Sequence, residues 1–417
     1  MSLRQLLLPD IAPLRESRSF RLLWIGQLIS LSGSQLRLVA LPYQIYLLTG
    51  SSFAVGLIGV VQAVPLLVLS LFGGVIADAV DRRRLLLITQ VGLAAVSLAL
   101  ALATQLGSSS VPLLYVLTAA GACFSALDNP TRASLAPTLV DRRHIRAAMA
   151  LNQTIFQFAL VFGSALAGFI IARLGLAGAY WLDAVSFAAA FAAVWLMRTP
   201  RRVNAERQPV LEALVEGVRY LGATRILLAT MSLDFLATFF GSPRALFPYY
   251  ADRVFHVGPE GLGLLYASMG AGALVAAVAS GWTARVQRQG LTVLVAVSVW
   301  GIAIVLFGLL DERAFVLALV LLAVANGADA VSSIFRGTIL QLVVPDALRG
   351  RLNAINIMFV LGGPQLGQFE SGAVAALASP VVSVISGGIA CVLSVVAVTA
   401  WIPEIARYRA HRDAPAT

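Results

Sequence analysis

The chain has 417 residues; 59% of them are hydrophobic, only 12% are charged, and the formal net charge is +10. Because a soluble domain carries about 25% charged residues, this composition excludes an ordinary soluble protein and predicts a membrane protein with many spans. The positive charge comes from arginines between the apolar segments, which membrane topology explains without a nucleic-acid partner.

Twelve apolar segments follow one another along the chain, each close to the ~20 residues that cross a bilayer core as a helix. They predict an all-α membrane protein. In chain order, we expect the spans at about 20–48, 52–77, 84–105, 112–138, 148–172, 178–197, 225–249, 260–284, 290–310, 314–342, 352–377 and 380–402.

The longest polar stretch lies between the sixth and the seventh expected span and divides the chain in two. Its later part has apolar residues at helical spacing with charged residues between them, a pattern typical of an amphipathic helix on a membrane surface. We therefore expect an N-terminal six-helix bundle at 1–197, a cytoplasmic linker with an amphipathic helix at 198–224, and a C-terminal six-helix bundle with a cytoplasmic tail at 225–417.

Arginine placement predicts the orientation in the membrane. Most loop arginines fall on one side of the expected spans, whereas only Arg173, Arg253 and Arg313 fall in loops on the other side. Because cytoplasmic loops are enriched in Lys and Arg, we expect both termini and the linker to be cytoplasmic.

An internal repeat relates the two halves of the chain. The sequence around Arg132 returns around Arg336, and 336 − 132 = 204; the same offset relates Asn152 to Asn356. A constant offset across a polar loop and two apolar segments indicates that one half-molecule is duplicated, which is typical of secondary transporters. Each copy carries an arginine inside an apolar segment, so the two arginines are candidates for machinery that both halves share.

The loop after the second expected span runs from Gly74 through Asp78 to Arg82 and Arg83. This spacing resembles the signature of the major facilitator superfamily between its second and third helices, although positions 79 and 81 depart from that signature. A positive-inside loop with no further role is the alternative. The resemblance and the repeat imply a conformational latch made of Gly74, Asp78, Arg82, Arg83, Arg132 and Arg336.

A second resemblance is densest from about Gly261 to Asn356 and includes Gly263, Tyr266 and Gln341. This stretch is similar to the bacterial enterobactin (siderophore) exporters, and to a wider group that includes drug efflux proteins. The resemblance implies a major facilitator fold, with twelve transmembrane helices in two pseudo-symmetric six-helix bundles. It also implies alternating access to a midplane cavity and, in most members, proton antiport.

Charged residues inside the expected spans supply candidates for proton coupling. Each costs a few kcal/mol to insert, so by default it faces the bundle interior or a cavity. Asp128 lies four residues before Arg132, so the two can neutralise each other. Asp234 lies nearer the cytoplasmic end of its span, where a solvated or packing role explains it slightly better. The candidates are Asp329, Glu370, Asp128 and Asp234.

Asp329 and Glu370 are the preferred proton carriers. Neither has an arginine one turn away on its own helix, and Arg336 lies seven residues after Asp329, too far for a simple pair. A carboxylate removed from water favours its neutral form, which suits reversible protonation. Asp183, at the start of the sixth span, lies too near the expected interface to be diagnostic.

Polar residues inside the spans supply candidates for a substrate cavity. Arg37 stands in the first span, where drug exporters of the superfamily often carry an acidic residue, and this suits an anionic or oxygen-rich substrate. Hydrogen bonding between helices explains the uncharged candidates equally well. The candidates are Arg37, Gln62, Asn152, Gln153, Gln157, Arg336 and Asn356.

The sequence contains no phosphate-binding glycine loop with a lysine and no Cys/His set with metal-ligand spacing. We therefore predict no enzyme activity, no catalytic residues, no metal site and no cofactor. The first hypothesis is a monomeric secondary exporter of a siderophore or similar amphiphilic small molecule, driven by proton antiport across a bacterial cytoplasmic membrane. Broad multidrug efflux is the alternative, and a non-transporting membrane receptor or scaffold is the alternative from another class.

Overall fold

The computed structural model describes residues 10–79, 81–198 and 210–409, and within these ranges every regular element is a helix. Nine helical stretches of the described residues are long and apolar enough to cross a membrane. The prediction of an all-α membrane protein is therefore confirmed. The count of twelve spans stays a prediction, because the helices at the first and eleventh expected spans, α3 and α15, are not among these nine.

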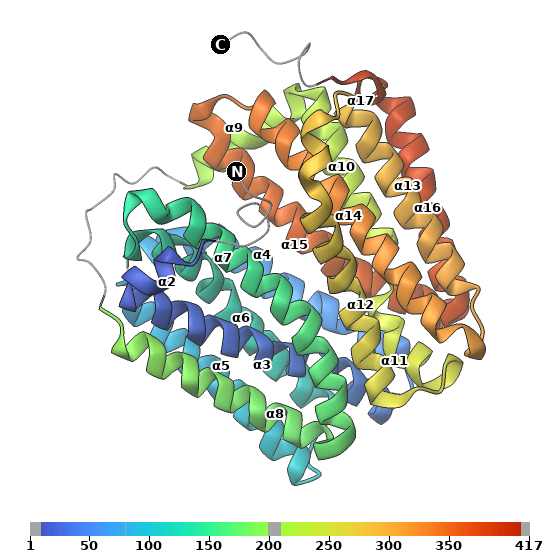
Figure 1. Cartoon of the computed structure of the whole chain (residues 1–417). Coiled ribbons are helices and arrows are strands. Elements are labelled where there is room, and N and C mark those ends of the chain that lie inside the picture. Colours follow the sequence, from blue (N-terminus) through green and yellow to red (C-terminus); the bar gives the residue numbers. More distant parts are fainter. Residues whose placement is uncertain (1–9, 80, 199–209, 410–417) are drawn as a thin grey trace. The chain divides into compact units, whose positions relative to one another are not determined.

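Short 3₁₀ and π segments join or extend the helices where the chain turns (Figure 1). The α-helices are α2 (Ala12–Glu16), α3 (Arg18–Thr49), α4 (Ser52–Ala79), α5 (Arg82–Gln105), α6 (Val111–Leu135), α7 (Ile145–Phe158), α8 (Ser164–Leu196), α9 (Val210–Ala223), α10 (Arg225–Phe240), α11 (Phe247–Tyr249), α12 (Gly258–Val278), α13 (Gln289–Gly308), α14 (Phe315–Val343), α15 (Asp346–Leu377), α16 (Pro380–Trp401) and α17 (Glu404–Arg407). The other segments are η1 (Ala136–Leu139), η2 (Arg142–His144), η3 (Ala159–Gly163), η4 (Pro243–Leu246), η5 (Tyr250–Val254), η6 (Ala279–Arg285) and η7 (Glu312–Ala314).

One of the nine stretches, Arg142–Leu196, contains both the fifth and the sixth expected span. Within it, α8 bends at Gly175, whose φ of 72° lies in the left-handed region. Glycine adopts this conformation without strain, whereas a residue with a Cβ atom would not. This glycine therefore separates the helical run of the fifth span from that of the sixth.

The contacts of the chain divide it into two compact units, and two helices contribute to both. The first turns of α4 belong to the second unit, and the first turns of α12 belong to the first unit. The division at 197 and 225 stays a prediction, because these units follow contacts rather than sequence order. The first unit is Met1–Thr49, Val64–Glu206 and Val257–Ala267; the second unit is Gly50–Ala63, Arg207–His256 and Ser268–Thr417.

In the first unit, α3, α5 and α8 lie side by side (Figure 1). An apolar cluster at one end of these helices includes Phe20, Leu86 and Val194, each no more than 1% exposed. Van der Waals packing of such side chains is what holds helices together in a membrane. The polar residues considered below therefore lie between closely packed helices.

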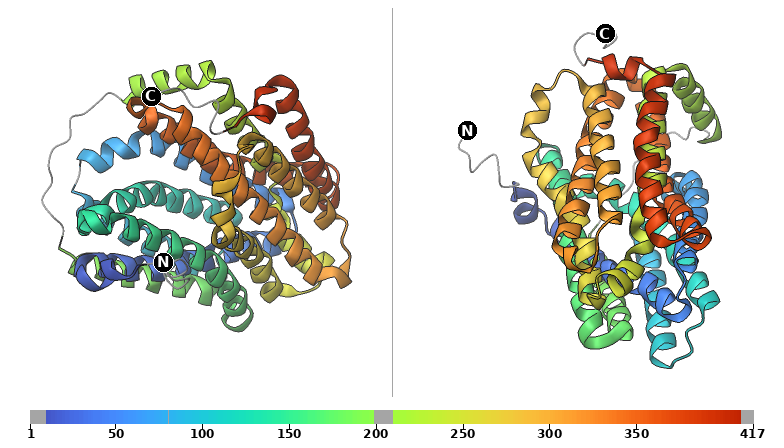
Figure 2. Two further views of the ribbon diagram at one scale, coloured as in Figure 1. Left: turned by 45° about the horizontal axis from the view of Figure 1, so that its top comes forward. Right: turned by 90° about the vertical axis from the view of Figure 1, so that its right-hand side faces the viewer.

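In the second unit, α13 lies between α14 and α16, and α10 packs against α15 and α16 (Figure 2). The helix α9 lies within the stretch expected to be the amphipathic linker and packs against α15. Gly217 of α9 allows a close approach to Ile355, and the hydroxyl of Tyr220 donates to the carbonyl of Val343. The linker helix is thus attached to the helices of this unit rather than extended in solvent.

Candidate functional site

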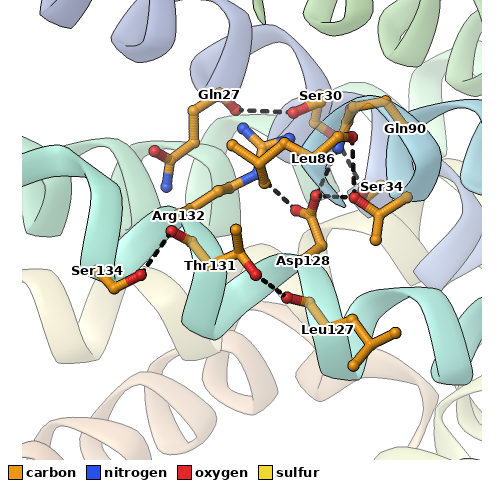
Figure 3. Close-up of polar contacts among 11 residues, drawn as sticks. Gln27, Ser30, Ser34, Leu86, Gln90, Leu127, Asp128, Thr131, Arg132 and Ser134 are labelled. Carbon is orange, nitrogen blue, oxygen red and sulfur yellow. Dashed lines mark hydrogen bonds and ion pairs between the residues drawn. The ribbon is translucent and has the colours of Figure 1, made fainter. Parts of the chain in front are cut away.

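Arg132 and Asp128 form a buried ion pair on α6, four residues apart as the sequence predicts. Nε of Arg132 lies 2.5 Å from Oδ2 of Asp128, and the two side chains are 7% and 8% exposed. Both side chains point toward the labelled Ser30 and Ser34 of α3 and Gln90 of α5 (Figure 3). The pair therefore faces the interior of the first unit.

Residues of α5 complete the hydrogen bonds of the Asp128 carboxylate. Thr89 Oγ1 and Gln90 Nε2 each donate to Oδ1 of Asp128 at 2.7 Å. One nitrogen of Arg132, Nη1, is buried and makes no hydrogen bond with any described residue. The carboxylate of Asp128 thus has a partner for each oxygen, whereas the charge of Arg132 is balanced mainly by this one carboxylate.

Replacing Asp128 with asparagine should lower the unfolding free energy by about 3 kcal/mol, because a buried arginine then loses its counter-charge. Thermal or denaturant unfolding in detergent measures this loss. The matched control is Asp141→Asn: Asp141 is 74% exposed and its carboxylate lies 3.7 Å from Arg143, so we expect a loss of about 0–1 kcal/mol. Equal losses in the two variants would contradict the assignment of a compensating role to Asp128.

In the second unit, Arg336 contacts two carboxylates and one hydroxyl, and we call these four residues the Arg336 cluster. Nη2 of Arg336 lies 2.6 Å from Oδ1 of Asp234 on α10 and 3.8 Å from Oδ1 of Asp329 on α14. Nη1 of Arg336 donates to Oγ of Ser332 at 3.0 Å. Asp234 is 4% exposed and ion-paired in the interior, so of the solvated and packing roles expected for it, the solvated one is wrong.

Asp329 is the weakly held member of the cluster. Its side chain is 33% exposed, and its Oδ1 atom makes no hydrogen bond with any described residue. Arg244 is a second positive group that acts on it electrostatically. As expected, Asp329 and Arg336 do not form a simple pair: they lie 3.8 Å apart, and Arg336 has a closer partner in Asp234.

Each arginine has one aspartate and one serine at equivalent positions of the repeat, but the two residue types are interchanged between the units. At the offset of 204, Asp128 corresponds to Ser332, and the buried Ser30 of α3 corresponds to Asp234. The first unit therefore pairs its arginine within one helix, and the second unit pairs its arginine between two helices. Of these two pairs, only the second links two different helices.

Glu370 lies on α15, and its Oε2 atom is buried without a hydrogen bond to any described residue. Nothing in the described contacts connects it to the Arg336 cluster. The uncharged candidates are spread over three helices: Gln62 is half-buried on α4; Asn152 and Gln157 are half-buried and Gln153 is exposed on α7; and Asn356 is half-buried on α15.

The predicted latch is described in part. Nη1 of Arg82 donates to the carbonyl of Ser134 at 2.9 Å, and Nε of Arg83 donates to the carbonyl of Val194 at 3.2 Å. These bonds connect the start of α5 to the ends of α6 and α8. The surroundings of Gly74 and the side chain of Asp78 lie outside the part of the chain that the structure describes, so the remainder of the latch stays a prediction.

Sequence reasoning missed Asp183 as a functional candidate. Its side chain is 0% exposed on α8 and lies against Arg37 of α3 and Ser97 of α5, so it is an interior residue with charged and polar partners. The signal that could have found it is the repeat: at the offset of 204, the positions of Arg37, Ser97 and Asp183 are all glycine in the second half. No group of three or more His, Cys, Asp or Glu in the described ranges is arranged to hold a metal ion.

Comparison with known proteins supports the transporter interpretation over nearly the whole chain. The family model of transmembrane secretion effectors matches residues 9–412. The enterobactin exporters EntS of Shigella boydii serotype 18 and Escherichia coli O157:H7 are each 28% identical over 407 residues, covering 97% of this chain and 97% of theirs.

Solved structures agree on the fold. A mutant of the peptide transporter POT in complex with alafosfalin has a TM-score of 0.77 at 12% identity, covering 98% of this chain and 99% of that chain. A mutant of the nucleoside transporter NupG has a TM-score of 0.75 at 12% identity, covering 92% and 99%. At this identity the likeness shows the fold alone, and it confirms the predicted major facilitator fold. The chain therefore belongs to the transmembrane secretion effector family, and it is a multi-pass transporter of small molecules in the major facilitator superfamily rather than an enzyme.

Proposed function

We propose that this chain exports a siderophore or a similar amphiphilic small molecule by proton antiport, with alternating access of a midplane cavity. The observation that carries the proton coupling is the Arg336 cluster, in which one arginine contacts two carboxylates at unequal distances. Asp234 holds the arginine closely, so Asp329 can change its protonation without leaving the arginine unpaired. In this proposal, Asp234 keeps the arginine neutralised while Asp329 binds and releases the proton.

Asp329 and Glu370 are the proton carriers in this proposal. Asp329 keeps a third of its side chain accessible, so a proton can reach it. Glu370 has a buried oxygen without a hydrogen bond to a described residue, and a neutral acid costs less there than a carboxylate. Asp128 is a weaker candidate, because Thr89, Gln90 and Arg132 all hold its charged form.

The siderophore cargo rests on the relatives, since both EntS proteins are enterobactin exporters in name and match 97% of the chain. Arg37, an arginine inside the first expected span, suits a cargo with anionic or oxygen-rich groups. In the same proposal the transporter acts as a monomer in a bacterial cytoplasmic membrane, with both termini and the α9 segment on the cytoplasmic side, as the arginine distribution favours. Arg82, Arg83, Arg132 and Arg336 belong to the latch of the moving halves.

The direct test is enterobactin movement and proton flux in proteoliposomes with a pH-sensitive dye inside. The parent protein should move enterobactin in exchange for protons. Asp329→Asn and Glu370→Gln should each reduce the coupled proton flux at least about tenfold if the residue carries the proton, because the exchange then lacks its carrier. Glu404→Gln is the matched control, since Glu404 is an exposed residue of α17 paired with Arg225, outside the expected spans.

The outcomes separate the alternatives. Unchanged proton flux in both variants would remove Asp329 and Glu370 as carriers. Movement of ethidium without movement of enterobactin would establish the multidrug efflux alternative. If neither compound moves, with or without a pH gradient, the transport proposal fails and the receptor or scaffold alternative replaces it.

A further inference from the structure

Three polar residues outside the Arg336 cluster meet between α3, α5 and α8 of the first unit. We call Arg37, Ser97 and Asp183 the Arg37 triad. Ser97 Oγ donates to Oδ2 of Asp183 at 2.6 Å, and Nη1 of Arg37 donates to Oγ of Ser97 at 3.4 Å. Nε of Arg37 lies 3.6 Å from Oδ2 of Asp183. A good charge-assisted hydrogen bond is about 2.8 Å long, so the arginine is loosely held.

The triad leaves both of its charges incompletely compensated. Asp183 is 0% exposed, yet its Oδ1 atom makes no hydrogen bond with any described residue. Arg37 is 17% exposed, and its Cζ lies 5.7 Å from the ring centroid of Phe187. A buried ion pair stabilises a fold only when its geometry is good and its other hydrogen bonds are made. In the Arg37 triad the ion pair is long and one carboxylate oxygen lacks a hydrogen bond, so stability does not explain it.

The second unit shows that the helix packing does not need the triad. At the offset of 204, its positions are Gly241 on the C-terminal side of α10, Gly301 on α13 and Gly387 on α16. A Cβ atom on Gly387 would collide with the carbonyl of Phe240, so the backbones of α10 and α16 touch where the first unit places polar side chains. The insertion cost of two buried charges in the first unit therefore points to a function.

We propose that the Arg37 triad is an anion-binding site in which Arg37 binds a carboxylate or phenolate of the cargo and Asp183 takes up one proton as the anion displaces it. Charge is conserved: the arginine–aspartate pair is neutral before binding, and the arginine, the anion and the protonated aspartate sum to zero afterwards. Arg37 is the accessible member, so the ligand meets it first. The proton goes to Oδ1 of Asp183, the oxygen without a partner.

The groups around Asp183 are consistent with a single titrating carboxylate. Arg37 faces it from α3, and α5 contributes only the hydroxyl of Ser97. On α8 itself the titratable neighbour is Tyr180, whose hydroxyl donates to Oε1 of Gln44 at 2.8 Å. This proposal rests on the proposed exporter for the identity of its cargo, but binding at the site does not require transport. The proton on Asp183 accompanies the cargo and is distinct from the protons that Asp329 and Glu370 exchange in the proposed antiport.

The test uses salicylate, a small aromatic anion, and its neutral analogue salicylamide, titrated against the full-length protein in detergent between about pH 5.5 and 8. Salicylate should bind more tightly as the pH falls, by up to about tenfold per pH unit, the limiting slope for one linked proton. In weakly buffered solution, binding should take up about one proton for each salicylate bound. Salicylamide should show neither effect.

Variants separate the proposal from a structural role. Asp183→Asn should bind salicylate with no dependence on pH, because its side chain cannot take up the proton. Arg37→Met should lose salicylate binding. The double variant Arg37→Met with Asp183→Leu should fold with an unfolding midpoint at or above that of the parent, because apolar residues replace a poorly made ion pair, and it should not bind salicylate.

Three results would overturn the proposal. They are an unchanged pH slope in Asp183→Asn, salicylate binding by Arg37→Met equal to that of the parent, and failure of the double variant to fold, which would make the triad structural. None of these results depends on enterobactin movement. A failure here therefore leaves the exporter proposal standing, and a failure of the proteoliposome test leaves the anion site standing.

Discussion

Moving the acid that pairs with Arg336 from position 234 to position 332 should lower the free energy of unfolding. The double variant Asp234→Ser with Ser332→Asp reproduces the arrangement of the first unit, where the acid lies one turn before the arginine on the same helix. We expect it to remain about 3 kcal/mol less stable than the parent, because each hydrogen bond to a buried charge contributes about 1.5–3 kcal/mol. Unfolding in detergent measures this difference.

The missing hydrogen bonds come from the neighbouring helix. Thr89 and Gln90 of α5 donate to Asp128 in the first unit, but at the offset of 204 their positions in α13 are Val293 and Leu294, which are 0% and 5% exposed. An aspartate at 332 would have an arginine beside it and no other donors at these positions. The exchange of aspartate and serine therefore follows from the residues that surround each site.

Adding Val293→Thr and Leu294→Gln to the relocated pair should recover most of the lost stability. The same two substitutions in the parent background should instead cost about 1–3 kcal/mol for each polar group left without a partner. The two substitutions thus change the free energy of unfolding in opposite directions in the two backgrounds. A thermodynamic cycle measures the difference as a coupling energy. Additive effects would contradict the equivalence of the two arginine sites.

The relocated quadruple variant also tests whether the pair must link two helices. Its arginine is paired within α14, so motion of α10 relative to α14 no longer breaks or forms an ion pair. We expect the folded variant to lose proton-coupled enterobactin movement by at least about tenfold, equivalent to about 1.4 kcal/mol of coupling. Transport at the level of the parent would show that the pairing of Asp234 with Arg336 has no part in coupling.

The sequence alone predicts the helices, the repeat and the pairing within one helix, because these depend on residues that are near in the chain. Asp128 and Arg132 share a face by helical spacing, and the structure shows their ion pair. Pairing between helices is different. The 3.6-residue period says which residues share a face, but it does not say which other helix packs against that face.

Asp234 and Asp183 show this limit most clearly. Each is the acidic member of an ion pair with an arginine on another helix, Arg336 and Arg37 respectively. Position near the end of the expected span left a solvated or packing role open for Asp234 and made Asp183 undiagnostic, yet both side chains are buried.

Two pairs of helices cross closely at glycine residues. In the first unit, α8 and α12 cross where a Cβ on Gly263 would lie 2.7 Å from Cα of Gly168. In the second unit, α4 and α15 cross where a Cβ on Gly372 would lie 2.9 Å from Cα of Gly56. The offset of 204 relates Gly168 to Gly372, so the repeat places a glycine at each crossing. Small residues at such points let helix backbones approach closely in a membrane.

Gly263→Val and Gly372→Val should each reduce enterobactin movement in proteoliposomes by about 5- to 150-fold. A valine side chain at either point would push apart two backbones that touch. Such overpacking costs about 1–3 kcal/mol. The same energy lowers the population of the closely crossed state by about 5- to 150-fold. Each crossing joins a helix from the first half of the sequence to one from the second half, so alternating access requires it to open and close.

Gly350→Val on α15 is the matched control, because nothing lies within 4 Å of a Cβ at that position. Parent-level transport in the two crossing variants, with the control also active, would show that neither crossing has to close during the transport cycle.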